Sequence, residues 1–314
     1  MTKTDQKYFL GDNGKFYNLY YEQVFLEQDG NKMFANVPDY FSTLFDWQVT
    51  RSRIYKNGIE EPNTIYLKTD FLPFFVYSVL PQIKNEFILI TACSDFSPQV
   101  NYNEFHWKKY YQILINNPKL KFWYMNNMRY KNEKTFSLPA GFGASAGNFW
   151  PGCTEKEADE FILKKSQSIN RNEKIDKIFC SFRDRITNVC GHDMVIRPEM
   201  TKIIENNKSL FNVYEPNMAF KEFVDTISKY KYALIPHGNG MDPNPTCWIS
   251  LALQTIPVIY KTPNSADMFV ETNSVIFFEN LDDIIKKDLY VDKDPIDFEF
   301  LTCKYWANKI KSKI

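Results

Sequence analysis

The chain has 314 residues, with 38 basic and 38 acidic side chains and a net charge of zero. Hydrophobic residues make up 44% and charged residues 24%, which is ordinary globular composition and excludes long disordered stretches. No basic stripe is present, so duplex nucleic acid is not an expected partner, and no apolar run has the length of a membrane span. The length exceeds what one ordinary core serves, which predicts two domains.

The N-terminus and the cysteines indicate a protein of a reducing compartment. Residues 1–7 are polar and lack the apolar core of a signal peptide, so a cytoplasmic location is expected. The six cysteines form no C-x-x-C pair, which predicts free thiols. The three histidines are scattered, so no metal site is expected.

The first half of the chain alternates short apolar strands with helices, after about 60 irregular residues. The helix at 104–115 is expected to bury Phe105, Ile113 and Leu114. The other predicted elements are a helix at 72–83 and strands at 64–67, 87–90, 121–124 and 135–138.

The second half repeats the alternation, beginning with a helix that Thr154 is expected to cap. The predicted strands are 177–181, 210–213, 232–235, 256–259 and 274–278; the helices are 154–169, 220–230, one after Pro245, and 297–311 with Phe298, Leu301 and Tyr305 on one face. Short apolar strands between helices are typical of parallel sheets covered on both faces. The pattern predicts an α/β fold with two Rossmann-like doubly wound domains, at 1–150 and 151–295, followed by a C-terminal helix at 296–314.

Ligands of doubly wound sheets bind beyond the carboxyl ends of the strands, and this rule selects candidate residues without any motif. In the first block it selects Asp70, Ser94, Asp95, Asn126 and Asn127, with Glu104 and His106 behind them. In the second block it selects Arg183, Arg185, Tyr214, Glu215, 237–242 and Lys261. Two such edges facing each other would form a cleft between the domains.

The richest of these edges is the loop at 236–246, which contains Gly238, Asn239 and Gly240. Glycines let a backbone turn tightly and approach a ligand. Asn244 and Pro245 have the pattern of a helix cap followed by proline at the first helical position, which would leave free N–H groups near Thr246 and Cys247 for a phosphate. The same residues also fit a plain loop and a capped helix.

Several edge residues suit a nucleotide ligand. The guanidinium groups of Arg183 and Arg185 could pair with a diphosphate, and His237 could donate to a phosphate or a sugar hydroxyl. Tyr214 and Glu215 could stack a base and bind a ribose. Solvated loops and a backbone-bonded histidine remain open as alternatives for all of them.

Residues 232–242, continued through Trp248 to 256–259, resemble the donor-site region of exostosin-like glycosyltransferases, including small cytosolic members encoded by large DNA viruses. Further matching stretches are 65–70, 87–91 with Ser94 and Asp95, and 138–142. The resemblance covers roughly 65–260. It implies a GT-B architecture of two facing Rossmann-like domains, a UDP-sugar donor in the second, inversion at the anomeric carbon, no required metal, and a last helix that crosses back to the first domain. The viral members suggest xylose.

Inverting transfer needs a base for the acceptor hydroxyl, and Asp95 or Asp70 would supply it from the first block. Donor contacts would come from Arg183, Arg185, Tyr214, Glu215, His237, Gly238, Asn239, Gly240, Asp242 and Thr246, and acceptor-side contacts from Asn126, Asn127 and His106. Asp70 also fits a helix cap.

The sequence departs from the family pattern at the donor helix. Ile249 stands where the family often has a glutamate that is thought to hold the donor ribose, and Gln254-Thr255 replaces the usual glycine-cysteine. Two other functions therefore stay open: a nucleotide-sugar- or glycan-binding protein without catalysis, and a nucleotide-dependent epimerase.

Overall fold

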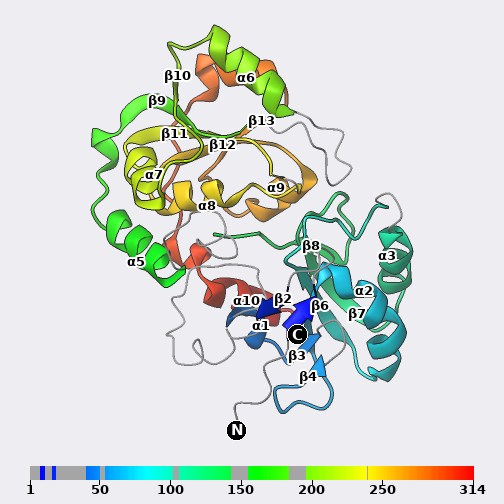
Figure 1. Ribbon diagram of the computed structural model, residues 1–314. Helices are drawn as coiled ribbons and strands as arrows, with labels where there is room; N and C mark the ends of the chain where they lie inside the picture. The colour runs from blue at the N-terminus through cyan, green and yellow to red at the C-terminus, as the bar shows by residue number, and fades with distance from the viewer. Residues whose placement is uncertain are drawn as a thin grey trace.

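The computed structural model describes residues 8–10, 16–18, 40–49, 54–101, 106–142, 155–183, 196–238 and 240–314. Most of them form two α/β units, each built around one sheet of mainly parallel strands (Figure 1). The first sheet ends at Ser137 and the second begins at Ile175. The predicted boundary at 150 lies outside the described residues and stays a prediction, as does the boundary before 296.

The first unit has a six-stranded sheet in the order β4-β3-β5-β6-β7-β8, in which only the β3–β4 pair is antiparallel. Its central strand β6 reads FILITA and is buried along its whole length, so both faces of the sheet need a cover. The strands are β3 (Trp47–Val49), β4 (Ile54–Tyr55), β5 (Thr64–Lys68), β6 (Phe87–Ala92), β7 (Leu120–Met125) and β8 (Thr135–Ser137). The helices are α1 (Tyr40–Thr43), α2 (Leu72–Phe74, continued by π and 3-10 turns to Gln82) and α3 (Trp107–Ile115).

The second unit has a five-stranded parallel sheet in the order β10-β9-β11-β12-β13. Its strands are β9 (Ile175–Cys180), β10 (Phe211–Val213), β11 (Tyr230–Ile235), β12 (Ile256–Tyr260) and β13 (Ile276–Phe278). Its helices are α5 (Glu155–Ser166), α6 (Ile196–Asn206), α7 (Phe220–Ile227), α8 (Pro245–Ala252) and α9 (Pro263–Met268). A separate antiparallel pair, β1 (Tyr8–Leu10) and β2 (Phe16–Asn18), precedes both units.

Both sheets are covered on both faces, by different chain paths. In the second sheet the strand order reverses between β9 and β11, so α6 packs on one face while α7 and α8 pack on the other. In the first sheet the parallel strands β3, β5, β6, β7 and β8 lie in sequential order, and right-handed crossovers therefore place α2 and α3 on the same face. Its opposite face belongs to the apolar cluster that also contains α1 and the C-terminal segment.

The C-terminal segment returns to the first unit, as the resemblance implies for a GT-B protein. The 3-10 turn Phe298–Leu301 leads into α10 (Cys303–Lys311), with Thr302 capping the helix between them. Trp306 shares a cluster with Tyr124 of β7, and the Nζ of Lys121 donates to the carbonyl of Ile314 over 2.7 Å. The predicted fold class is thus confirmed: two Rossmann-like units with a C-terminal helix packed back on the first.

Some local predictions need correction. Ile113 was expected in the core but is 42% exposed, whereas Leu114 is buried as predicted. The terminal helix is interrupted at Thr302, and the sequence reading missed β3 and α9, which are too short to show a clear period. Cys93, Cys180, Cys247 and Cys303 are free thiols, as expected. The predictions for Glu104, Phe105, Thr154, Arg185 and Asn239 lie outside the described residues.

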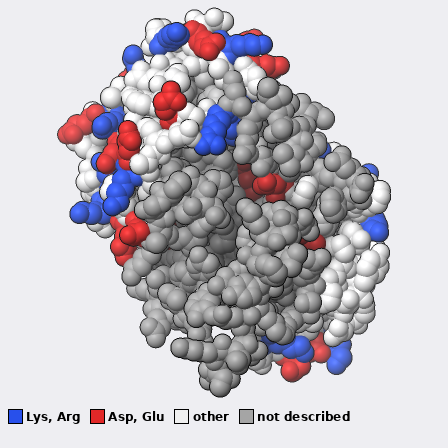
Figure 2. All heavy atoms as spheres, viewed as in Figure 1, with Lys and Arg blue, Asp and Glu red and all other residues white. Residues whose placement is uncertain are grey.

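The surface of the described residues is mixed in charge. Figure 2 shows lysine and arginine interspersed with aspartate and glutamate over the second unit, without a large patch of one sign among the coloured atoms of that face. Within the described ranges, no helix is both long and apolar enough to cross a membrane.

Candidate functional site

The reversal of strand order in the second sheet marks one crevice as the expected ligand position. Strands β9 and β11 are hydrogen-bonded neighbours from which the chain departs in opposite directions, and ligands of doubly wound sheets bind beyond the carboxyl ends of such a pair. Ser181 and Arg183 follow β9, while Pro236 and His237 follow β11. Two of the predicted donor residues, Arg183 and His237, therefore lie at this switch point.

Arg197, which sequence reasoning did not single out, joins the two loops at the switch point. Its Nε and Nη2 donate to the carbonyl oxygen of His237 over 2.9 and 2.6 Å, and its Nη1 donates to the carbonyl oxygen of Arg183 over 3.1 Å. The residue sits in the first turn of α6, the helix that follows β9. Its position directly after a loop with two other arginines is the sequence signal that could have found it.

The side chain of Arg183 is available to a ligand at this edge, since it is exposed and donates from Nη2 to the Oδ1 of Asn217. Arginine presents several donors in a planar fork, which matches the oxygens of a diphosphate. Arg183 and Arg197 together give the crevice two positive charges.

Tyr214 is placed differently from the expected base-stacking position. Its ring stacks on Phe179 with centroids 5.3 Å apart, and its hydroxyl lies 2.5 Å from the hydroxyl of Tyr230. The hydrogen bond with Tyr230, followed by burial, raises the pKa of Tyr214 to about 12. The ring thus supports the sheet. Glu215 is exposed, and its carbonyl oxygen accepts from the hydroxyl of Ser181 over 3.2 Å.

The predicted N-cap of α8, Asn244, is confirmed, but the free N–H groups predicted at Thr246 and Cys247 are not. The side chain of Asn244 accepts from the N–H of Thr246 over 2.8 Å, and Pro245 occupies the first turn of α8. The N–H of Cys247 donates to the carbonyl of Asn244 over 2.9 Å. The expectation that Thr246 and Cys247 leave their N–H groups open to a phosphate was therefore wrong, because the cap takes both.

The two glycines of the loop have different surroundings. Gly238 is exposed, and a Cβ built on it would meet its nearest heavy atom, the Cβ of Asn244, at 3.9 Å. A Cβ on Gly240 would lie 2.7 Å from the Cγ of Asn127 in the first unit. Gly240 therefore permits a close approach, as predicted, but the approaching group is a side chain of the other unit.

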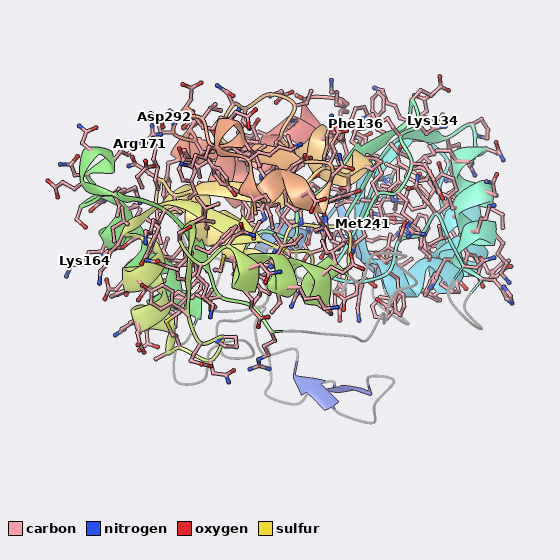
Figure 3. The ribbon with its side chains drawn as sticks, turned by 90° about the horizontal axis from the view of Figure 1, so that it is seen from above. Lys134, Phe136, Lys164, Arg171, Met241 and Asp292 are labelled. Atoms are coloured by element: carbon pink, nitrogen blue, oxygen red, sulfur yellow. The ribbon has the colours of Figure 1, made fainter. Side chains whose placement is uncertain are left out.

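Asn127 is the centre of this contact between the units. Its Oδ1 accepts from the N–H of Met241 over 2.6 Å and from the N–H of Asp242 over 3.1 Å, while its Nδ2 donates to the carbonyl of Ser94 over 2.7 Å. Figure 3 shows Met241 between the two units. The backbone φ of Asn127 is +56°, a left-handed conformation that asparagine tolerates better than most residues.

The same contact brings two carboxyl groups together. Asn127 holds both the loop that carries Asp95 and the loop that carries Asp242, and Asp95 is near enough to raise the pKa of Asp242. Asp95 is exposed, whereas Asp242 is 6% exposed and accepts through Oδ1 from the Nδ2 of Asn264. Burial is the main cause that raises the pKa of Asp242 to about 8, against hydrogen bonds from Asn264 and Asn127 that lower it. One carboxyl is thus kept neutral beside another that faces solvent.

We expect the Asp242→Asn variant to flatten the dependence of stability on pH. An aspartate in an unfolded chain has a pKa of about 3.9, so between that value and pH 8 the folded chain binds one more proton here than the unfolded chain. The contribution of Asp242 to stability is therefore highest below about pH 4 and falls as pH rises, by at most about 1.4 kcal/mol per pH unit. Urea unfolding of the variant at pH 5, 6.5 and 8 should give a smaller fall than wild type. The exposed Asp288→Asn control should keep the wild-type slope, and an equal slope in both variants would contradict the assignment.

The remaining first-unit candidates are Asn126, Asp70 and His106, and only Asn126 is bonded to the loop of Asp95 in the described contacts. Asn126 is 3% exposed and donates from Nδ2 to the carbonyl of Ser94 over 2.9 Å, so it braces the Asp95 loop. Asp70 lies in the 3-10 turn after β5, with its Oδ2 3.3 Å from the Nζ of Lys68. This ion pair lacks hydrogen-bond geometry, which leaves that oxygen without a hydrogen-bond partner among the described residues. His106 is exposed at the start of α3, where its side chain makes no cap hydrogen bond.

Two features of the second unit bear on the ligand it could take. Ile249 is 1% exposed inside α8, so this position cannot touch a ribose. Among the described residues, no three histidine, cysteine, aspartate or glutamate side chains are grouped as a metal site would require.

Comparisons with known proteins add a distant likeness. No family model matches the chain, and no curated protein matches it. Over 80% of its length the chain is similar to 70% of a solved structure described as trehalose-6-phosphate from E. coli bound with UDP-2-fluoro glucose, with 10% sequence identity and a TM-score of 0.39. A likeness this distant says nothing about the activity of the chain, which has to be argued from its own residues.

Proposed function

We propose that the protein is a glycosyltransferase that moves a sugar from a UDP-sugar to a hydroxyl group of a glycan. One observation carries the proposal: the loop at the switch point of the second sheet continues into Met241 and Asp242, which contact Asn127 beside the loop of Asp95. A donor bound by the second unit would therefore present its reacting carbon to the edge of the first.

The donor diphosphate would lie beyond β9 and β11. Arg183 would bind it directly, and Arg197 would hold the two loops at the right separation through its hydrogen bonds to the carbonyls of Arg183 and His237. His237, Gly238 and Thr246 remain proposed donor contacts, together with Glu215, Asn239 and Arg185. Tyr214 would support β9, the strand that ends at the site, because its ring stacks on Phe179.

Asp95 is the proposed base. Its carboxylate takes the proton of the acceptor hydroxyl, the acceptor oxygen forms a bond to the anomeric carbon, and the bond from that carbon to the phosphate oxygen breaks. The electron pair of the broken bond leaves with UDP, whose charge the arginines stabilise. Asp242 beside Asp95 is buried and held neutral, which leaves Asp95 as the solvent-facing carboxyl group of the pair.

The finer features of the proposal follow the exostosin-like resemblance. Attack from the face opposite to the leaving group inverts the anomeric carbon, and Arg183 with Arg197 would do the work that a metal ion does in other transferases. Xylose is the first donor sugar to test. Asn126 and Asn127 stay proposed for the acceptor side only through the loops they hold, since both side chains are buried.

The proposal is tested by titrating UDP and a panel of UDP-sugars in a calorimeter, followed by an assay for release of UDP in the presence of several glycans. Binding of UDP with acceptor-dependent release of free UDP is the expected result. Absence of UDP binding would overturn the donor assignment.

We expect Arg183→Ala to weaken UDP binding about 10- to 100-fold, because a charge-assisted hydrogen bond contributes roughly 1.5–3 kcal/mol. The matched control is Lys286→Ala, which removes an exposed cation that pairs with Asp283 over 2.6 Å and does not belong to the loops after β9 and β11. Calorimetry should show wild-type affinity in the control. Equal affinities for UDP in wild type and Arg183→Ala would remove this arginine from the site.

A second candidate function is a nucleotide-sugar- or glycan-binding protein without catalysis. The burial of Ile249 and the occupied N–H groups of Thr246 and Cys247 favour it, because both remove contacts that an active donor site would use. UDP-sugar binding without turnover, over the full panel of acceptors, would decide for this candidate.

A further inference from the structure

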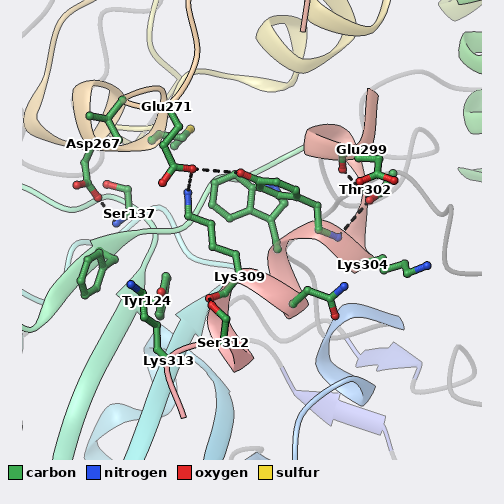
Figure 4. Close-up of a pocket in the computed structure, with 16 residues that line it drawn as sticks. Tyr124, Ser137, Asp267, Glu271, Glu299, Thr302, Lys304, Lys309, Ser312 and Lys313 are labelled. Carbon is green, nitrogen blue, oxygen red and sulfur yellow. Dashed lines mark hydrogen bonds and ion pairs between the residues drawn. The ribbon is translucent and has the colours of Figure 1, made fainter. Parts of the chain in front are cut away.

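A cavity of about 630 Å³ lies where α10 meets both units, and its lining does not include the residues that follow β9 and β11 (Figure 4). Strands β7 and β8 of the first unit, α9 and the residues after it from the second, and the C-terminal segment all contribute to its wall. The volume falls in the range of roughly 300–1,000 Å³ that ligand pockets occupy.

The charges around the cavity are balanced. Its lining contains three acidic residues, Asp267, Glu271 and Glu299, and three lysines, Lys304, Lys309 and Lys313. Glu271 accepts from the Nζ of Lys309 over 2.7 Å and from the hydroxyl of Tyr305 over 3.3 Å (Figure 4). A wall of this kind attracts neither an anion nor a cation strongly, but it offers many donors and acceptors.

One buried polar group at the cavity, the hydroxyl of Tyr124, forms no hydrogen bond within the described ranges. Tyr124 of β7 is 1% exposed and lines the cavity, and its hydroxyl has no hydrogen-bond partner among the described residues. Burial, followed by the charges of Asp267 and Glu271, raises the pKa of Tyr124 to about 12. These two carboxylates line the same cavity, so the hydroxyl end of Tyr124 is the end that faces it. Buried hydroxyls nearly always have partners, which makes this one a candidate for a ligand contact.

Aromatic rings supply the apolar part of the wall. Phe136 stacks on Tyr124 with centroids 5.2 Å apart, and Tyr305 meets Trp306 edge to face with centroids 5.5 Å apart. Sugars expose C–H groups on their faces and hydroxyls at their rims, so they need both ring surfaces and a mixed set of donors and acceptors.

We propose that this cavity is a binding site for a neutral saccharide unit, held by both units and by α10. The ligand class follows from balanced charge, aromatic surface and an unused buried hydroxyl in one cavity. The site goes beyond the proposed transfer reaction and does not depend on it. Helix α9 connects the two regions: its Asn264 contacts Asp242, while Asp267 lines the cavity and accepts from the N–H of Ser137 over 2.7 Å. A saccharide here would therefore strengthen the contact between the units.

The test uses the full-length protein and a set of methyl glycosides of glucose, galactose, mannose and xylose, with binding followed by saturation-transfer NMR and calorimetry. Wild type should bind at least one of them, and Tyr124→Phe should weaken that binding about three- to tenfold, the net contribution of one hydrogen bond. Thermal unfolding should show no loss of stability in Tyr124→Phe, because the hydroxyl has no hydrogen-bond partner to lose in the described parts of the chain. The matched control is Tyr77→Phe, which changes a tyrosine that is 61% exposed and does not line the cavity.

A second variant, Glu299→Gln, changes the exposed rim of the cavity and should also weaken glycoside binding. The affinity for UDP should be the same in wild type and in both variants, which separates this site from the donor site. Absence of binding for all the glycosides, or glycoside affinity unchanged in both variants, would overturn the proposal. Binding of UDP or inorganic phosphate that Tyr124→Phe weakens would overturn the ligand class.

Discussion

Replacement of Asp95 by asparagine is expected to lower the rate of sugar transfer about 10²- to 10⁴-fold, which is the usual contribution of a general base. The amide keeps the size of the side chain but cannot take the acceptor proton. Since Asp95 is exposed in the loop after β6, the substitution should leave the fold and the affinity for UDP unchanged. Single-turnover transfer and UDP calorimetry measure the two quantities separately.

Asp70→Asn is the comparison for this experiment, because Asp70 is the other carboxylate predicted at the same edge. Its ion pair with Lys68 gives it a structural role at the end of β5, so we expect near wild-type transfer from this variant. Full activity in Asp95→Asn together with a large loss in Asp70→Asn would exchange the two assignments. The backbone conformation near Asp95 favours its assignment as the base. Cys93, two residues before it, has a φ of +56°, and such conformations cluster at functional sites.

The second large effect is expected from Gly240→Ala, which should destabilise the protein by about 3 kcal/mol. The new Cβ would lie 2.7 Å from the Cγ of Asn127, and moving that side chain breaks its hydrogen bonds to Met241, Asp242 and Ser94. Two of these hydrogen bonds are buried and the one to Ser94 is partly buried, and each contributes about 1 kcal/mol. Urea unfolding, read as a shift of the midpoint at constant slope, measures the loss.

Gly238→Ala is the matched control, since it makes the same chemical change two residues away in open space. Its nearest neighbour would be 3.9 Å away, so we expect a change below about 0.5 kcal/mol. In an Asn127→Ala background, Gly240→Ala should cost less than in wild type, because the obstructing amide is gone. Equal effects of the two glycine variants would contradict the contact between Gly240 and Asn127.

Most strands of the two sheets could be predicted because each is a short apolar run, which is a local property of the chain, whereas β3 and β4 were missed. Strand β6 and strand β11 both lie where the apolar pattern puts them, and the cap of α8 follows from Asn244 and Pro245 alone. Ile113 shows the limit of such reasoning, since a helix of nine residues has few apolar positions to fix which side faces the sheet.

The candidate site could be predicted only in part. The rule for the carboxyl ends of parallel strands selected Arg183, His237, Asp242 and Asp95, and the structure brings Asp95 and Asp242 together. It could not select Arg197, which acts through backbone carbonyls of two other segments. It also could not tell that the hydroxyl of Tyr214 lies 2.5 Å from the hydroxyl of Tyr230.

By itself the sequence determined the class of fold and the edges of the two sheets, because period, capping and burial are local properties of the chain. Only the tertiary structure decided which residues at those edges contact one another. The contact of Gly240 with Asn127 joins residues more than 100 positions apart, as does the hydrogen bond that the N–H of Met128 donates to the Oδ1 of Asn264. The raised pKa of Asp242 and the unused hydroxyl of Tyr124 arise in the same way, because desolvation and hydrogen-bond partners depend on which segments pack together.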